Sequence, residues 1–580
     1  MTATIPTDML ARITTFGDLL RYLRRRACIT QTDLSIAVGY SDAQISRLEQ
    51  NLRLPNIPTI QARFVPALRL QNEPAATDRL LQLATAAQQA KASAIGRPRD
   101  VLGSGLPPSI AVLPFVNLSA DPDNDYFCDG LSEELINALA KLEYLFVVAR
   151  ASAFSFKGRG MDVREIGRAL KVAHILEGSV KKSGERLRVT AQLINADTGF
   201  HLWSERFDRQ ITDLFEIQDE ITLAIVEKLR IKLLDRDARV LLNPRRQGDL
   251  AAYNLYLKGR YYWAQRPQGI NMAIDYFNQA IAKDPNYALA QAGLADCYAT
   301  LGSWENGTLP PIKAMSHALS AATKALELDD QLGEAHAALA YRTTHHDWDW
   351  DTADKQFRHA LELNPNYAVA HHWYSHYLTA VGRIEESLAA SKRCLELDPL
   401  DLVINIHMAW HHQFSRQYDE AVEQCWRTNE LHPNSFWPPY FFALAFEQQG
   451  KIGDAVNEFE KAIKMSGNVT FAIAGLGHLY ASCGEQRKAT AIIDSLLARS
   501  RVTYVPAYDI GLVHAGLGRS DLAFEYLHKA HHERSGWLTY LRVEPRLDSL
   551  RPDPRFKALL QRLHLCDESW NRIANPVLQP

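Results

Sequence analysis

LELNPNY (361–367), LELDPLD (395–401) and NELHPNS (429–435) are versions of one phrase that returns every 34 residues. An earlier version, AIAKDPNY, ends at Tyr287. Small residues recur in register with these phrases, at Ala273, Ala353, Ser387, Ala421, Ala455, Ala489 and Ala523. A 34-residue period with a helix-loop-helix pattern in each copy predicts an α-solenoid, a stack of helical hairpins, over about 250–540.

The repeats resemble the tetratricopeptide family over roughly 254–537, which corresponds to about eight hairpins. One hairpin cannot bury its apolar face alone, so neighbouring hairpins stack and leave a long concave groove. The resemblance implies that a protein or a peptide binds in this groove. Five residues match first-helix positions that line the groove in that family: His346, His372, His376, Trp410 and Tyr440.

Two of these residues also have the spacing of a metal site. His372 and His376 lie four residues apart, as two zinc ligands on one helix face would. Because the repeat register already places both of them in the groove, we favour groove lining over metal binding. The sequence therefore predicts no metal site and no cofactor.

A second region, 109–235, has a different residue pattern from the repeats. Segments rich in β-branched and apolar residues alternate with amphipathic segments, which predicts a small α/β domain. The predicted strands are SIAVLPF (109–115), LFVVAR (145–150), AHILEGSVKK (173–182) and LRVTAQLIN (187–195), and the predicted helices lie near 129–142, 162–171 and 213–234.

SIAVLPFVNLSADPDNDYFCDGLSEELINAL and the segments that follow it are similar to the TolB-like domain over about 109–234. The resemblance implies an α/β fold that packs against the repeats and has no established chemistry. Four acidic residues near its start lack the glycine and the glutamate of a calcium loop, so we interpret them as a solvated acidic loop. They are Asp121, Asp123, Asp125 and Asp129.

The N-terminal region has its own charge balance. Residues 1–70 hold nine arginines and no lysine against five acidic residues, whereas the whole chain has a net charge of −3. This end alone therefore has an electrostatic reason to bind nucleic acid.

Two helix starts follow one another within this region. Thr30-Gln-Thr-Asp33 and Ser41-Asp-Ala-Gln44 have the spacing of capping boxes, and Gly39 between them suits a tight turn. The pattern predicts a helix-turn-helix in an all-α domain at 1–92, followed by a linker at 93–108. The inner faces are expected to carry Leu34, Ala37, Ile45 and Leu48.

Residues 23–56 resemble the Cro/phage-repressor family. The resemblance implies that helix 30–37 crosses the DNA backbone and that helix 41–50 enters the major groove. It also implies an interior ion pair between Arg24 and Glu49, and we favour phosphate contact for the arginine run 24–26. The predicted DNA-binding residues are Gln31, Thr32, Ser41, Asp42, Ala43, Gln44, Arg47 and Arg53.

Motifs of nucleotide, metal and hydrolytic enzymes are absent from the sequence, as is an apolar run of membrane-spanning length. The seven cysteines are scattered, which is typical of a reducing compartment. We expect a multidomain, non-enzymatic cytoplasmic regulator with a C-terminal cap and tail at 541–580. Its predicted partners are double-stranded DNA and a protein, peptide or small-ligand signal, with a homodimer as one arrangement.

Two alternatives stay open at this point. The helix-turn-helix could serve as a docking domain, which would make the chain a tetratricopeptide scaffold or adaptor that does not bind DNA. An enzyme is the third hypothesis, because TolB-like domains accompany some adenylate-cyclase-type proteins.

Overall fold

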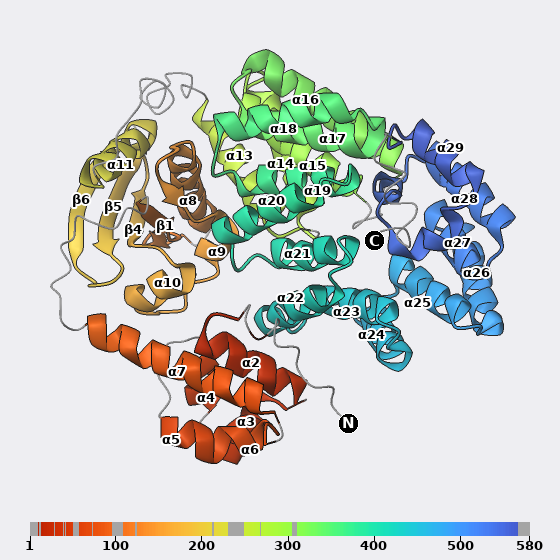
Figure 1. Ribbon diagram of the computed structural model, residues 1–580. Coiled ribbons are helices and arrows are strands. Elements are labelled where there is room, and N and C mark those ends of the chain that lie inside the picture. The colour runs from red at the N-terminus through yellow and green to blue at the C-terminus, as the bar shows by residue number, and fades with distance from the viewer. Residues whose placement is uncertain are drawn as a thin grey trace. The chain divides into compact units, whose positions relative to one another are not determined.

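The structure is a computed structural model, shown in Figure 1. It divides into two compact units, Met1–Leu106 and Pro107–Pro580. No described helix is both long enough and apolar enough to cross a membrane. The described residues are 10, 13–27, 29–38, 40, 42–49, 57–71, 73–94, 108–121, 124–211, 214–229, 249–266, 268–303 and 310–566.

The first unit is helical throughout its described part. Its helices are α2 (Phe16–Arg26), α3 (Gln31–Val38), α4 (Asp42–Glu49), α5 (Ile57–Thr59), the π-helical turn η1 (Ile60–Phe64), α6 (Val65–Ala67) and α7 (Pro74–Ala94). Side chains from these helices share one apolar core, which includes Leu19, Leu20, Leu23, Leu34, Val38, Ile45, Leu48, Phe64 and Leu80. The predicted all-helical character of this region is confirmed, and the predicted linker falls mostly outside the described residues.

The start of α3 is capped as the sequence predicts. Asp33 N donates to Thr30 Oγ1 at 3.0 Å, and Thr30 N donates to Asp33 Oδ2 at 2.9 Å. Each end of the box thereby satisfies a backbone donor that the first helical turn leaves without a partner. The predicted second cap at Ser41 and the turn at Gly39 lie outside the described residues.

The packing of α2 and α3 against α4 differs from expectation at one position. Leu34, Ile45 and Leu48 are buried as expected, but Ala37 is exposed and Val38 takes its place in the core. Close approach of α2 and α4 depends on Gly17, because a Cβ there would lie 2.4 Å from the Glu49 carbonyl oxygen.

The second unit begins with a mixed sheet. Its strands are β1 (Ser109–Val112), β2 (Val116–Asn117), β3 (Phe146–Val147), β4 (His174–Ser183), β5 (Arg186–Asn195) and β6 (His201–Gln210), in the order β3-β1-β4-β5-β6 with β2 also on β4. The β1, β2 and β3 pairings are parallel, and β4-β5-β6 is antiparallel. The helices are α8 (Asp125–Ala140), α9 (Arg150–Phe154), α10 (Val163–Leu170) and α11 (Leu214–Lys228).

The small α/β domain is thus confirmed, with two corrections. Strand β6 was not predicted, because HLWSERFDRQ is largely polar and most of its side chains are exposed. Asp129 does not belong to a solvated loop: it lies in α8, is 4% exposed, and pairs with Lys157 at 2.6 Å. Burial raises the pKa of the Asp129 carboxyl from its ordinary value.

In the described part of the rest of the unit, eight helix pairs follow one another, in agreement with the predicted number. Figure 1 labels their helices. They are α13 (Leu250–Trp263) with α14 (Ile270–Lys283), α15 (Ala288–Leu301) with α16 (Pro311–Leu328), α17 (Gly333–Arg342) with α18 (Trp350–Leu363), α19 (Ala368–Ala380) with α20 (Ile384–Leu397), α21 (Leu402–Phe414) with α22 (Tyr418–Leu431), α23 (Trp437–Gln448) with α24 (Ile452–Ser466), α25 (Thr470–Ser482) with α26 (Gln486–Ser500), and α27 (Ala507–Gly516) with α28 (Ser520–His532).

The recurring small residues explain why the pairs pack closely. All seven lie on the second helix of a pair, and none is more than 1% exposed. A larger side chain at these crossings would force the helices apart. The α17–α18 connection is irregular, with a π-helical turn η5 (Thr343–Asp347) ahead of Trp348.

A segment after the last pair was not foreseen in this form. It contains two 3₁₀ turns, η6 (Gly536–Tyr540) and η7 (Pro545–Leu550), and the helix α29 (Pro554–Arg562). We call residues 536–565 the C-terminal segment. The segment packs against earlier repeats: the Tyr540 ring contacts Trp410, and the Trp350 indole donates to the Leu563 backbone carbonyl at 2.8 Å.

Candidate functional site

The repeat phrases hold the α/β domain against the array. Asn366, in the LELNPNY phrase, donates from Nδ2 to the backbone carbonyls of Ala140, Leu142 and Leu145 at 3.1, 3.2 and 2.9 Å. Its carbonyl accepts from the Arg393 guanidinium at 2.9 Å. This side chain therefore joins the end of α8 to the repeats.

The next phrase, LELDPLD, makes a second junction. Asp398 accepts a hydrogen bond from the Ser152 backbone N at 2.7 Å, and the Ser152 hydroxyl accepts one from Leu400 N at 2.8 Å. Burial, and then the nearby Asp401, raise the pKa of the Asp398 carboxyl to about 7. Two successive repeat loops are thus used as docking points for the domain.

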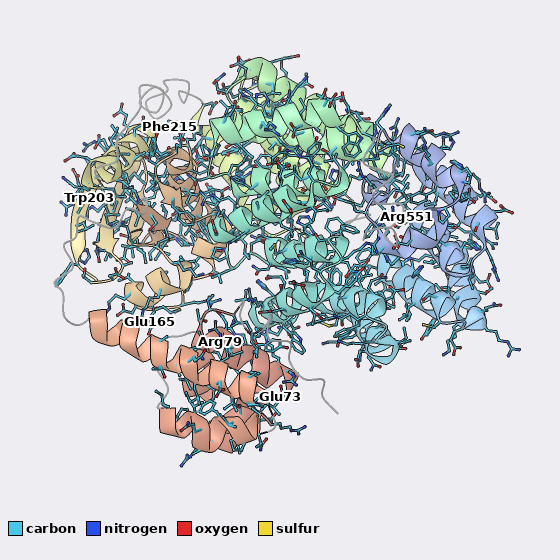
Figure 2. The ribbon with its side chains drawn as sticks, in the orientation of Figure 1. Glu73, Arg79, Glu165, Trp203, Phe215 and Arg551 are labelled. Atoms are coloured by element: carbon cyan, nitrogen blue, oxygen red, sulfur yellow. The ribbon has the colours of Figure 1, made fainter. Side chains whose placement is uncertain are left out.

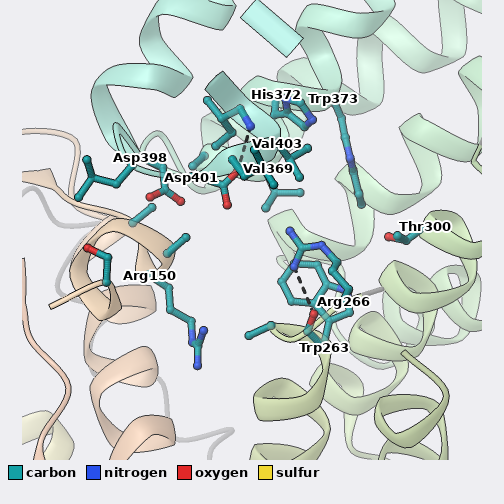
Figure 3. Close-up of a pocket in the computed structure, with 18 of the residues that line it drawn as sticks. Arg150, Trp263, Arg266, Thr300, Val369, His372, Trp373, Asp398, Asp401 and Val403 are labelled. Atoms are coloured by element: carbon teal, nitrogen blue, oxygen red, sulfur yellow. Dashed lines mark hydrogen bonds between the residues drawn. The ribbon is translucent and has the colours of Figure 1, made fainter. Parts of the chain in front are cut away.

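A cleft of about 1410 Å³ lies between these docked parts. Its wall combines α8 and α9 of the α/β domain with α13, α19 and the loops that carry the repeat phrases (Figure 3). Natural ligand sites commonly occur between domains, where a cavity is lined by apolar surface and a few polar groups. The volume is large enough for a small organic ligand or a short peptide.

One side of the cleft is cationic. Glu133 pairs with both Arg150 at 2.9 Å and Arg260 at 2.6 Å, so the charges of these two arginines are partly balanced. Arg266 instead lies over the Trp263 ring at 3.9 Å and donates to the Trp263 carbonyl at 3.3 Å. Its contacts among the described residues are with Trp263 and include no ion pair with a carboxylate, so it can offer its guanidinium to an anionic group (Figure 3).

The predicted groove residues separate into two sets. His372 and His376 line the cleft, with 9% and 1% of their surfaces exposed. Trp410 and Tyr440, in contrast, are buried in the core, with 1% and 0% exposed. The expectation that these two aromatic residues contact a partner in a groove is wrong for this structure.

For Trp410, the cause of that correction is the C-terminal segment. The Tyr540 ring contacts Trp410 with 4.5 Å between ring centroids, and its hydroxyl lies 3.0 Å from His345 Nε2. Tyr440 packs among other aromatic rings, including Phe471 at 4.9 Å. His346 lies in η5 beside Asp347, outside the cleft.

A third histidine joins His372 and His376. His407, on α21, places Nδ1 at 3.0 Å from His376 Nε2 and at 3.1 Å from His372 Nε2. Burial lowers the pKa of His372 and His376 well below the usual range, so both rings are neutral at neutral pH. Sequence spacing found the pair on one helix but missed His407, which comes from the next repeat, 35 residues after His372.

In the N-terminal unit, the predicted ion pair is confirmed. Arg24 binds Glu49 through Nε at 2.5 Å and Nη2 at 3.1 Å. Glu49 also accepts from the Gln31 amide nitrogen at 2.8 Å. Since this amide is engaged inside the unit, a phosphate contact by Gln31 stays a prediction.

Two arginines of the run 24–26 form ion pairs inside the unit, as Arg24 was expected to do, and phosphate contact by the run stays a prediction. Arg24 is held by Glu49, and Arg26 forms a two-bond pair with Glu73 at 2.6 and 2.8 Å. Glu73 lies just ahead of α7 and is labelled in Figure 2. Thr32 is exposed on α3. The remaining predicted DNA-binding residues stay predictions: Asp42, Ala43, Gln44 and Arg47 lie on α4 with side chains outside the described part, and Ser41 and Arg53 lie outside the described residues.

Comparisons with known proteins agree with part of this organisation. Residues 106–224 match the family of the HilA/YgeH-like transcriptional regulator, second domain. A Rhizobium meliloti protein named "Putative adenylate cyclase 3" is 39% identical over 241 residues, which cover 40% of this chain and 40% of that protein. The transcriptional regulator HilA of Salmonella typhimurium is 26% identical over 306 residues, or 51% of this chain and 53% of HilA.

The chain therefore spans about half the length of these relatives or less. Among solved structures, the type IV pilus biogenesis factor PilW aligns with 36% of this chain and 95% of its own, at 19% identity and a TM-score of 0.30. That score is too low to support a common overall fold.

Proposed function

We propose that the chain is a DNA-binding transcriptional regulator that receives a signal in the cleft between its α/β domain and its repeats. The observation that carries the proposal is the match of residues 106–224 to the second domain of a transcriptional regulator family, together with the helical unit that precedes it. In this proposal the α/β domain is a TolB-like domain that couples the repeats to the DNA-binding end.

The N-terminal unit would bind DNA as a helix-turn-helix of the Cro/phage-repressor type. Glu49 on α4 binds Arg24 of α2 and Gln31 of α3, which ties the three helices together, and the Thr30–Asp33 box caps α3. Helix α4 would enter the major groove. Arg47 would read guanine from α4, and Gln31, Thr32 and Arg53 would contact the backbone. A homodimer would place two such helices about one turn of DNA apart.

The signal site is the cleft rather than the concave groove, because the chain's own C-terminal segment covers Trp410. Arg266 and the stacked Trp263 ring would bind an anionic group, and His372 and Trp373 would form the opposite wall (Figure 3). The docked loops at Asn366 and Asp398 would transmit a change of cleft occupancy to the α/β domain.

The test is the affinity of the full chain for labelled duplex DNA across a salt series. A regulator of this kind loses affinity as salt rises, because arginine contacts release counterions from the phosphates. Arg47→Ala should weaken specific binding by about 1–3 kcal/mol. The matched control is Arg159→Ala, which removes the same charge from an exposed site on the α/β domain and should leave affinity unchanged.

Salt-independent, weak association of the wild-type chain with any duplex would favour the alternative, a tetratricopeptide scaffold that does not bind DNA. The name of the Rhizobium meliloti relative favours a third candidate, an adenylate cyclase. The non-enzymatic proposal rests on the absence of nucleotide-binding motifs from this sequence.

A further inference from the structure

Three imidazole nitrogens converge at the inner end of the cleft. His407 Nδ1 faces His376 Nε2 and His372 Nε2, and one ligand nitrogen of each of the three rings lies within 4.8 Å of the other two. Two of the separations, 3.0 and 3.1 Å, are close to the distance of about 3.3 Å expected between nitrogens that share a tetrahedral zinc ion with bonds of about 2.0–2.1 Å.

Hydrogen bonding alone cannot satisfy this arrangement. A neutral imidazole nitrogen either donates one proton or accepts through one lone pair. His407 Nδ1 faces two ring nitrogens at hydrogen-bond distance, and so it can make only one good bond of the two. A cation between the rings would instead take one lone pair from each of the three nitrogens.

The surroundings hold the three rings in place. Trp410 lies against both His376 and His407, with 5.3 Å between centroids in each case. His411, whose Nδ1 is 2.6 Å from the Ser391 hydroxyl, packs edge-on against His376.

Access comes from the cleft. His372 and His376 are part of its wall, whereas His407 lies behind them. A cation held by all three rings would therefore keep one coordination position directed toward the cleft. Zinc sites that bind an exchangeable group have three protein ligands and an open fourth position, whereas structural zinc sites have four protein ligands.

We propose that His372 Nε2, His376 Nε2 and His407 Nδ1 bind one divalent transition-metal ion of the zinc class, with its fourth position open to the cleft. Imidazole ligands suit zinc, cobalt and nickel and are poor ligands for calcium or magnesium. This proposal departs from the sequence-based expectation of no metal site. It does not depend on whether the chain binds DNA.

The experiment is a Co²⁺ titration of the untagged, chelator-treated full chain, followed by visible absorption and then by competition with Zn²⁺. We expect one equivalent of Co²⁺ to give the intense absorption of a four-coordinate ion, and Zn²⁺ to remove it. His407→Gln and His376→Gln should each weaken binding by at least about tenfold, which corresponds to about 1.4 kcal/mol.

Two neighbouring histidines provide matched controls. His371→Gln alters α19 next to His372, and His412→Gln alters α21 five residues after His407, yet neither ring belongs to the cluster. Both variants should bind Co²⁺ as the wild-type chain does. Circular dichroism of each metal-free variant establishes that it is folded before its titration is compared.

The proposal is overturned if the wild-type chain gives only the weak spectrum of six-coordinate Co²⁺, or if His407→Gln binds as tightly as His412→Gln. If His407→Gln does not fold, the wild-type spectrum and the His376→Gln titration decide. Unchanged binding in His376→Gln would assign the ion to other histidines and equally overturn the proposal.

Discussion

At the scale of single residues, position in the repeat does not decide what a side chain does. Asn366 and Asn286 occupy the same place in the phrases LELNPNY and AIAKDPNY. Asn286 is exposed, whereas Asn366 is 4% exposed and bonds three carbonyls of the α/β domain. The repeat places an asparagine in each of these loops. Asn366 becomes a structural contact because the α/β domain lies beside its loop.

Asn366→Ala should therefore destabilise the second unit. The change removes the Asn366 donor from buried carbonyl oxygens, at a cost of about 1–3 kcal/mol. We expect the urea midpoint of the full chain to fall, while Asn286→Ala, at the equivalent exposed loop, leaves the midpoint near that of the wild type. Equal midpoints for the two variants would show that the Asn366 contacts do not stabilise the junction.

Asp398 should make the stability of the folded chain depend on pH. Its pKa is about 7 in the folded chain, above the ordinary value of 3.8, because burial disfavours the charged form. Between these two values the folded state holds a proton that the unfolded state has lost, so this group makes stability fall as pH rises from about 4 to 7.

Asp398→Asn retains an acceptor for the Ser152 N–H but cannot ionise. We expect the variant to gain stability relative to the wild-type chain as pH rises, with the larger advantage at pH 8 and the smaller at pH 4, in thermal unfolding scans. Asp284→Asn, at the equivalent half-buried repeat position, serves as the control. Parallel pH curves for Asp398→Asn and the wild type would refute a raised pKa at this site.

At the scale of elements, regular local patterns were predictable and contacts between distant segments were not. The 34-residue phrases predict eight helix pairs, because each copy carries the full pattern of its own hairpin. Strand β6 escaped prediction because its polar sequence lacks a buried alternation, and its place is fixed by pairing with β5. The C-terminal segment has no repeat pattern, so its return to Trp410 could not be read from sequence.

The residues of the candidate sites fall into the same two groups, those predictable from local sequence and those placed by contacts between distant segments. His372 and His376 were found from their spacing on one helix, and the Arg24–Glu49 pair was found from a family resemblance. His407 and the docking role of Asp398 depend on contacts between separate repeats and domains, which sequence spacing does not encode.

The C-terminal segment should behave as part of the core. The Tyr540 ring is fully buried among Trp410, Phe414 and His345. Tyr540→Ala should cost about 3–5 kcal/mol, as truncation of large buried aromatic residues does. Urea unfolding measures the loss.

Tyr144→Ala removes a tyrosine that is 48% exposed and should change stability little. Comparable unfolding midpoints for Tyr540→Ala and Tyr144→Ala would mean that the segment is not held against the repeats in solution.

At the scale of the whole molecule, we propose a DNA-binding end followed by a signal-binding body, and we propose no enzymatic activity. The full chain incubated with ATP and Mg²⁺ or Mn²⁺ should therefore form no cyclic AMP above a blank without protein. Product that accumulates in proportion to protein concentration would contradict the non-enzymatic proposal and revive the cyclase candidate.

The most direct test of the central claim is selection of duplexes from a random-sequence pool by the full chain at fixed, physiological salt. The account predicts that successive rounds enrich one sequence motif and that Arg47→Ala loses the enrichment while Arg159→Ala retains it. A pool that stays random for the wild-type chain would contradict sequence-specific DNA binding, and the protein would then be better described as a repeat scaffold.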